Sequence, residues 1–199
     1  MDLDPTLNWK VGWGPAGWLN PPPGARRDQD DLLIEAAEGS DLWRTTSYGF
    51  IHDTGHALLA DFPDRTAAEV TFVADFSAQF DQAGLLVRAD AERWIKAGVE
   101  FSDGVPQIGA VVTHRVSDWS VAPVPEWTGA VVTVRASRTG DALTVRARAG
   151  HEQWRLVRVA PLPSGPLQVG LYCCAPTRAG LLVRFKDLRL VAADEALHS

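Results

Sequence analysis

Short segments in which apolar and polar residues alternate fill this chain from residue 68 onward, and they restrict its fold more than any other feature. A period of two places alternate side chains on opposite faces of a β-strand, as for Val70, Phe72 and Ala74. Turn-forming residues such as Ser102-Asp103-Gly104 separate the segments at short intervals, and no segment of useful length has the helical period. The sequence therefore predicts an all-β sandwich. Its strands are expected within residues 68–76, 83–88, 94–101, 107–113, 132–134, 143–147, 154–159, 167–173 and 181–190.

The beginning of the chain is rich in Trp, Gly and Pro. The run Pro21-Pro22-Pro23-Gly24 is incompatible with a central strand or a helix interior. We expect an entry strand at Asn8–Trp13, a second strand at Leu32–Ala36 and an edge segment at Asp41–Arg44.

Length and charge limit the classes of protein to consider. A chain of 199 residues with 46% hydrophobic composition buries roughly 70% of its unfolded surface, so residues 1–199 are expected to form one domain. The net charge of −6 and the lack of a basic cluster argue against a nucleic-acid partner. The sequence has neither a signal-peptide pattern nor a run of about 18 apolar residues. We therefore expect a cytoplasmic protein without a membrane partner.

The two cysteines, Cys173 and Cys174, are adjacent in an expected strand. Their side chains should point to opposite faces, so buried free thiols are favoured over a strained vicinal disulfide.

The segment from Trp94 to Phe101 has two unlike faces if it is a strand. Ile95, Ala97, Val99 and Phe101 form an apolar face. The opposite face presents an aromatic ring, a cation, a gap and an anion in the order Trp94, Lys96, Gly98 and Glu100. A face that only met water would have little need for a large aromatic residue, and a face against a second core would not carry Lys and Glu. The second face is therefore a candidate site.

Matching apolar residues between neighbouring strands fixes a register for this sheet, because a slip of one residue would place core side chains opposite polar ones. The register places Val99 beside Ile108 and Ala97 beside Ala110. On the other face, three glycines from three strands then lie in one row: Gly84, Gly98 and Gly109. Such a row would leave a trough in the sheet, although each glycine could instead mark a bulge or a twist.

Residues on this face are candidates for ligand binding. Arg88 beside Trp94 could form a cation–π contact, and Gln82 and Gln107 could donate hydrogen bonds to Glu100. Ser117-Asp118-Trp119-Ser120 is expected to form a loop that carries Trp119 over the rim of the trough, unless Trp119 packs the loop onto the core. The predicted ligand-binding residues are Gln82, Gly84, Arg88, Trp94, Lys96, Gly98, Gln107, Gly109, Thr113 and Trp119.

Catalytic signatures are few. The nucleophile elbow, the phosphate-binding loop, the dinucleotide fingerprint and the paired-cysteine zinc pattern are all absent from the sequence. A glycoside hydrolase needs two carboxylates about 5 to 10 Å apart, and Glu100 is the best candidate, with Asp118 or Asp81 as its partner. His52 and His56 have no further ligand at a standard spacing, so we predict no metal and no cofactor.

Several segments resemble the domain of unknown function 1349 family, to which regulation-of-enolase proteins belong. The resemblance covers nearly the whole chain. It lies in Trp18-Leu19-Asn20-Pro21-Pro22, Asp41-Leu42-Trp43-Arg44, Asp81-Gln82-Ala83-Gly84-Leu85, Trp94-Ile95-Lys96-Ala97-Gly98-Val99-Glu100, Ser117-Asp118-Trp119-Ser120 and Val183-Arg184-Phe185.

The resemblance implies a two-sheet antiparallel jelly-roll sandwich of the concanavalin A-like lectin and glucanase type. In related lectins and glucanases the concave sheet holds carbohydrate. The Glu-x-Asp-x-x-Glu arrangement of the glucanases is absent here, since Phe101, Ser102 and Asp103 follow Glu100.

Three functions fit these observations. The first is a binding module that holds a carbohydrate or another small polar ligand on the concave face. The second is a carbohydrate-active enzyme, a glycoside hydrolase or lyase, with Glu100 as acid or base. The third, which the family resemblance implies, is a regulatory protein that binds a metabolic enzyme.

Overall fold

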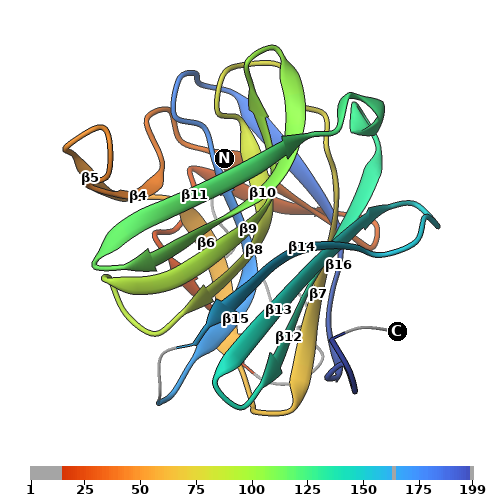
Figure 1. The fold of residues 1–199 in the computed structure, drawn as a ribbon. Helices are drawn as coiled ribbons and strands as arrows, with labels where there is room; N and C mark the ends of the chain where they lie inside the picture. The colour runs from red at the N-terminus through yellow and green to blue at the C-terminus, as the bar shows by residue number, and fades with distance from the viewer. Residues whose placement is uncertain (1–14, 163–164, 198–199) are drawn as a thin grey trace.

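Two antiparallel sheets of seven strands each stack face to face in the computed structural model, which describes residues 15–162 and 165–197 (Figure 1). The order in the first sheet is β1 (Gly17–Leu19), β6 (His56–Asp61), β15 (Gln168–Cys174), β8 (Gln82–Arg88), β9 (Arg93–Ser102), β10 (Val105–His114) and β11 (Val116–Pro123). The order in the second sheet is β14 (Arg155–Pro161), β13 (Ala142–Ala149), β12 (Val131–Thr139), β7 (Thr66–Val73), β16 (Leu181–Ala192), β3 (Asp31–Ala36) and β2 (Gly24–Asp28). The prediction of an all-β sandwich is confirmed.

Three further elements lie outside the two large sheets. The strands β4 (Leu42–Arg44) and β5 (Ile51–Asp53) form a hairpin that lies beside β11 at one side of the first sheet (Figure 1). The 3₁₀ helix η1 (Pro125–Trp127) has three residues. No helix in the described part of the chain is long and apolar enough to cross a membrane.

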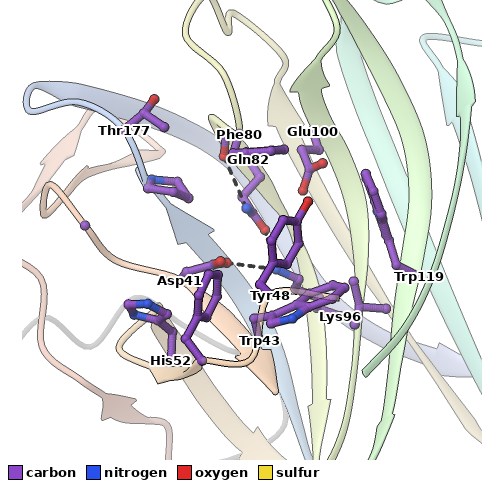
Figure 2. Close-up of a pocket in the computed structure, with 14 residues that line it drawn as sticks. Asp41, Trp43, Tyr48, His52, Phe80, Gln82, Lys96, Glu100, Trp119 and Thr177 are labelled. Atoms are coloured by element: carbon purple, nitrogen blue, oxygen red, sulfur yellow. Dashed lines mark hydrogen bonds and ion pairs between the residues drawn. The ribbon is translucent and has the colours of Figure 1, made fainter. Parts of the chain in front are cut away.

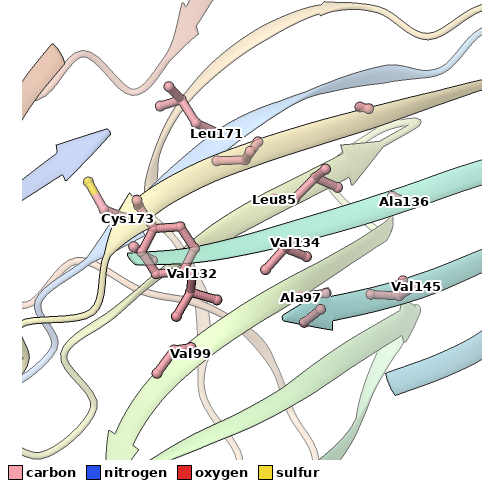
Figure 3. Packing of buried hydrophobic residues seen from close by; sticks show 14 of the residues in the cluster. Leu85, Ala97, Val99, Val132, Val134, Ala136, Val145, Leu171 and Cys173 are labelled. Atoms are coloured by element: carbon pink, nitrogen blue, oxygen red, sulfur yellow. The ribbon is translucent and has the colours of Figure 1, made fainter. Parts of the chain in front are cut away.

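The main core fills the space between the two sheets. The apolar face predicted for residues 94–101 points into it, where Ala97 and Val99 of β9 pack with residues such as Val132 and Val134 of β12 (Figure 3). The expected strand Leu32–Ala36 is β3, whereas the expected strand Asn8–Trp13 lies outside the described residues. Cys173 belongs to this core and Cys174 to the opposite face, and both are free thiols, as expected.

The predicted register is confirmed for β8, β9 and β10. Val99 pairs with Ile108 and Ala97 pairs with Ala110. Gly98 pairs with Gly84 on one side and with Gly109 on the other. The apolar pattern was therefore sufficient to align three strands.

A second, smaller core covers part of the outer face of the first sheet. Trp94 is only 2% exposed and packs there in a cluster with Trp43 of β4. This cluster corrects the prediction that Trp94 faces a ligand, because the β4–β5 hairpin folds over its ring. The members of the cluster are Leu42, Trp43, Ala57, Leu59, Leu86, Trp94, Val111, Tyr172 and Cys174.

The segment Ser117-Asp118-Trp119-Ser120 is not a loop. It forms the middle of β11, the strand at the end of the first sheet, and pairs with β10 over eight residues. Because side chains alternate along a strand, Asp118 and Trp119 point to opposite faces of the sheet.

Candidate functional site

A pocket of about 320 Å³ opens on the outer face of the first sheet, between β9 and the β4–β5 hairpin (Figure 2). Strand β9 contributes Lys96 and Glu100, and β11 contributes Trp119. The hairpin and the segments around it supply most of the remaining wall. The lining residues are Gly39, Asp41, Trp43, Tyr48, Phe50, His52, Phe80, Gln82, Lys96, Glu100, Val111, Trp119, Pro176 and Thr177.

Buried and half-buried polar contacts fix the hairpin in place over the sheet. Arg88 of β8 makes two hydrogen bonds of 2.8 Å to the carboxylate of Asp53, at the end of β5. The Asn20 side chain donates to the backbone oxygens of Asp53 and Gly55. Arg88, which the sequence predicted as a ligand-binding residue, thus anchors the pocket wall and does not line the pocket. The guanidinium of Arg88 and the carboxylate of Asp53 form a bidentate pair, which fixes their relative orientation.

Thr113 has a similar positioning role. Its hydroxyl lies 2.9 Å from that of Ser117, and Ser117 Oγ accepts a hydrogen bond from the backbone N–H of Arg44 in β4. Thr113 was predicted to bind a ligand, but it is fully buried and does not line the pocket. The Ser-Asp-Trp-Ser motif therefore serves the pocket in two ways, since Ser117 holds the hairpin and Trp119 lines the cavity.

Lys96 is a buried cation with two partners. Its ammonium donates to Oδ1 of Asp41 at 3.1 Å and to Oε1 of Gln82 at 2.8 Å (Figure 2). Burial lowers the pKa of the ammonium, but the surrounding acidic groups, Asp41 foremost with Cys174 and Glu100, together outweigh this effect and the pKa is raised overall. Lys96 is therefore charged at neutral pH.

Glu100 carries a buried oxygen that has no hydrogen bond. None of the described residues donates to Oε1. The predicted hydrogen bonds from Gln82 and Gln107 do not form, because Gln82 donates to the backbone oxygen of Phe80 and Gln107 donates to Ser102. Burial raises the pKa of Glu100 to about 7, although the positive charge of Lys96 offsets part of this effect.

Aromatic rings form the wall opposite this polar floor. Trp43 contacts both Tyr48 and Trp119 edge-on, with ring centroids 5.5 and 6.4 Å apart, and Tyr48 stacks on Phe50. Trp43 also packs in the smaller core and is only 7% exposed, while the sequence analysis assigned no role to Tyr48 or Phe50. Both lie in the hairpin turn, where no alternation marks the inward side.

The row of glycines does not form the predicted trough. The space that lies over Gly98 and Gly109 is a hollow of only about 10 Å³ beside the main pocket, and Gly84 lines neither cavity. A Cβ atom at Gly84 would collide with the carbonyl oxygen of Ala97, and one at Gly98 with that of Ala83. Main-chain atoms already occupy the space, so these glycines permit close approach of strands instead of leaving room for a ligand.

The predicted acidic partners of Glu100 lie elsewhere. Asp118 is exposed, pairs with Arg158 of β14 and does not line the pocket. Asp81 is fully buried in an ion pair with Arg178. The second acid in the pocket is Asp41, which the sequence reasoning left out of the site.

The two histidines do not form a metal site. His52 lines the pocket, whereas His56 is buried and accepts a hydrogen bond from the backbone N–H of Ala37 through Nε2. Its Nδ1 lies 2.7 Å from the carbonyl oxygen of Asn20, to which it donates in this tautomer. Within residues 15–162 and 165–197, no group of three or more His, Cys, Asp or Glu side chains could hold a metal ion.

The fold and the site together define a β-sandwich with an aromatic-walled pocket on the outer face of one sheet. The chain belongs to the family described as Protein of unknown function (DUF1349), whose model matches residues 18–193. It is 36% identical over 183 residues to the Saccharomyces cerevisiae protein named Regulation of enolase protein 1, covering 91% of this chain and 92% of the relative.

Solved structures agree with this assignment. The crystal structure of a functionally unknown protein from Saccharomyces cerevisiae superposes with a TM-score of 0.83 at 34% identity, covering 89% of this chain and 96% of that one. A mutant of the GH43 protein BlXynB from Bacillus licheniformis has a TM-score of 0.66 at 12% identity. That match covers 83% of this chain but only 33% of the GH43 protein, and it shows a common fold alone.

Proposed function

We propose that this protein binds a carbohydrate or another small polar ligand in the pocket under the β4–β5 hairpin. The observation that carries the proposal is Oε1 of Glu100, a buried oxygen that no described residue satisfies and that belongs to a group lining an open cavity. A buried acceptor without a partner costs about 1–3 kcal/mol, which a donor on the ligand would recover.

The composition of the pocket supports a ligand of this class. Aromatic walls pack against the C–H face of a sugar ring, while a few polar groups orient its hydroxyls. Trp43 and Trp119 provide such walls, and Glu100 provides an acceptor.

A thermal-shift panel of neutral, acidic and amino sugars and small metabolites tests this proposal. A ligand that binds the folded state raises the melting temperature by mass action. We expect a shift for the wild-type protein that falls strongly in Glu100→Gln and persists in Glu126→Gln. Glu126 is the matched control, because it is an exposed Glu that pairs with Arg155 away from the pocket. A panel without any shift, or a shift of equal size in Glu100→Gln, would overturn the proposal.

A second candidate function is carbohydrate chemistry with Glu100 as general acid or base. The pKa of about 7 favours it, because such a group exchanges protons readily at neutral pH. Asp41 already pairs with Lys96, so Glu100 would act without the second carboxylate of a glycoside hydrolase. Turnover that Glu100→Gln abolishes while ligand binding persists would establish this alternative.

A third candidate function is binding to a metabolic enzyme. The side chains of Tyr48, Phe50 and Ile51 are exposed on the hairpin turn, and exposed aromatic residues are enriched at interfaces. The name of the yeast relative makes enolase the partner to test. Purified enolase should then bind the wild-type protein and not a Tyr48→Ser variant, whereas equal binding of both would exclude the hairpin as the interface.

A further inference from the structure

The charges that line the pocket are unequal. Two acidic residues, Asp41 and Glu100, line it together with the ammonium of Lys96 and the imidazole of His52. The ammonium of Lys96 is already hydrogen-bonded to Asp41 and Gln82. The carboxylate of Asp41 therefore balances the charge of Lys96. When Glu100 ionises, it adds a second negative charge, and no cation among the described residues that line the pocket donates a hydrogen bond to its Oε1.

Among the described residues, Lys96 is the only Lys or Arg that lines this pocket, and two of its three N–H groups are already donated to Asp41 and Gln82. The nearby arginines do not line it and are engaged elsewhere, since Arg88 pairs with Asp53 and Arg44 pairs with Glu92. Because Asp41 is paired with Lys96, the ionised form of Glu100 is the charge that would repel a carboxylate or phosphate, and a like charge inside a partly buried site is costly.

The aromatic wall favours the opposite sign of charge. A ring face attracts cations that lie within about 6 Å of its centroid. The cation–π pairs found among the described residues use Phe62, Trp127 and Trp154. Trp43, Tyr48 and Trp119 have no such partner among them, so no side chain of the described protein fills this role at the pocket.

From these observations we infer that the ligand of this pocket carries a protonated amine, which donates to the carboxylate of Glu100 and lies against the rings of Trp43, Tyr48 and Trp119. This inference rests on the proposed function and narrows it to amine-bearing polar ligands, of which an amino sugar is the simplest carbohydrate. A donor N–H is required in addition to the charge, because Oε1 has no hydrogen bond from the described residues.

The ionisation of Glu100 supports the same ligand class. Burial and the negative charges of Asp41 and Asp103 raise its pKa to about 7, while Lys96 opposes them. An ammonium ion at the Glu100 carboxylate favours its ionised form and lowers this pKa. Binding near pH 7 should therefore release a fraction of a proton from Glu100.

Three monosaccharides of related shape test the inference by calorimetric titration at pH 7. Glucosamine has a protonated amine, N-acetylglucosamine has a neutral amide at the same position, and glucuronic acid has a carboxylate. We expect glucosamine to bind at least tenfold more tightly than N-acetylglucosamine, and glucuronic acid to bind more weakly than either. Glu100→Gln should remove the tenfold preference and Glu126→Gln should keep it.

The outcomes separate the inference from the proposed function. Equal or tighter binding of N-acetylglucosamine or glucuronic acid by the wild-type protein would overturn the inference and leave a polar-ligand pocket. A tenfold preference that persists in Glu100→Gln would also overturn it, because the amine would then be recognised elsewhere. If the protein binds none of the three sugars while the thermal-shift panel yields a neutral or acidic ligand, only the inference of an amine-bearing ligand fails. If no compound of the panel shifts the melting temperature, the proposed ligand-binding function fails as well.

Discussion

The ammonium of Lys96 lies 3.1 Å from Oδ1 of Asp41, and this ion pair joins the middle of β9 to the start of the β4–β5 hairpin across 55 residues of sequence. Lys96 is only 4% exposed, so the pair is largely shielded from water. The ion pair therefore connects β9, which forms the floor of the pocket, to the β4–β5 hairpin, which forms its roof.

Loss of one partner of this pair should be costly. Lys96→Met leaves the Asp41 carboxylate without its cation, and breaking a buried pair costs about 3–5 kcal/mol. The double variant Lys96→Met/Asp41→Asn should recover part of the loss, because it removes the unpaired charge as well. Urea unfolding of the single and double variants measures this difference. A double variant that is no more stable than Lys96→Met would show that the charge of Asp41 is not what destabilises the single variant.

Glu100 should make the protein less stable as the pH rises. Its pKa is about 7 in the folded protein and near 4.5 in the unfolded chain, so between these values the folded state holds a proton that the unfolded state lacks. Stability therefore falls as the pH rises from 4.5 to 7, by about 3 kcal/mol from this group alone. Glu100→Gln cannot lose that proton, so its unfolding free energy should exceed that of the wild type at pH 8 and approach it at pH 5. Parallel pH profiles of wild type and variant would contradict the assignment.

A methyl group at Gly98 should disrupt the first sheet. The Cβ of Gly98→Ala would collide with the backbone oxygen of Ala83, and backbone atoms cannot move aside as a flexible side chain can. We expect a loss of at least about 3 kcal/mol, at the upper end of overpacking costs. Gly17→Ala in β1 is the matched control, because nothing lies within 4 Å of its Cβ and it should melt like the wild type. Equal melting temperatures for both variants would refute the close approach of β8 and β9.

Removal of the Trp119 ring should weaken ligand binding with little effect on stability. The residue is 38% exposed and lies on the end strand β11, so little core packing is lost in Trp119→Ala. The affinity for glucosamine should fall about 2- to 10-fold, as for the loss of one cation–π contact at a partly exposed site. Trp154→Ala, which removes the ring that packs on Arg148, is the control and should bind like the wild type. Unchanged affinity in Trp119→Ala would remove Trp119 from the site.

The sandwich and the register of β8, β9 and β10 could be predicted because both depend on the alternation of apolar residues along strands. Val99 and Ile108 are paired by that pattern alone. Two residues of the predicted candidate face, Lys96 and Glu100, line the pocket.

The roof of the pocket could not be predicted in the same way. The contacts that hold it, such as Arg88 with Asp53 and Lys96 with Asp41, join short irregular segments to the sheet over 35 and 55 residues. Such pairings follow no sequence period. Trp94 was therefore predicted to face a ligand, although residues of the hairpin cover it, and Tyr48 was not predicted to line the pocket.

The close packing at Gly84 and Gly98 fixes the sheet beside the pocket. Main-chain atoms fill the space where larger side chains would stand, so neither position accepts a larger residue that could reshape the sheet. The hairpin turn at residues 45–50 has no such restriction, and it carries Tyr48 and Phe50 into the pocket wall. Changes in ligand size should therefore be engineered by lengthening or shortening this turn while the sheet beneath it is kept constant.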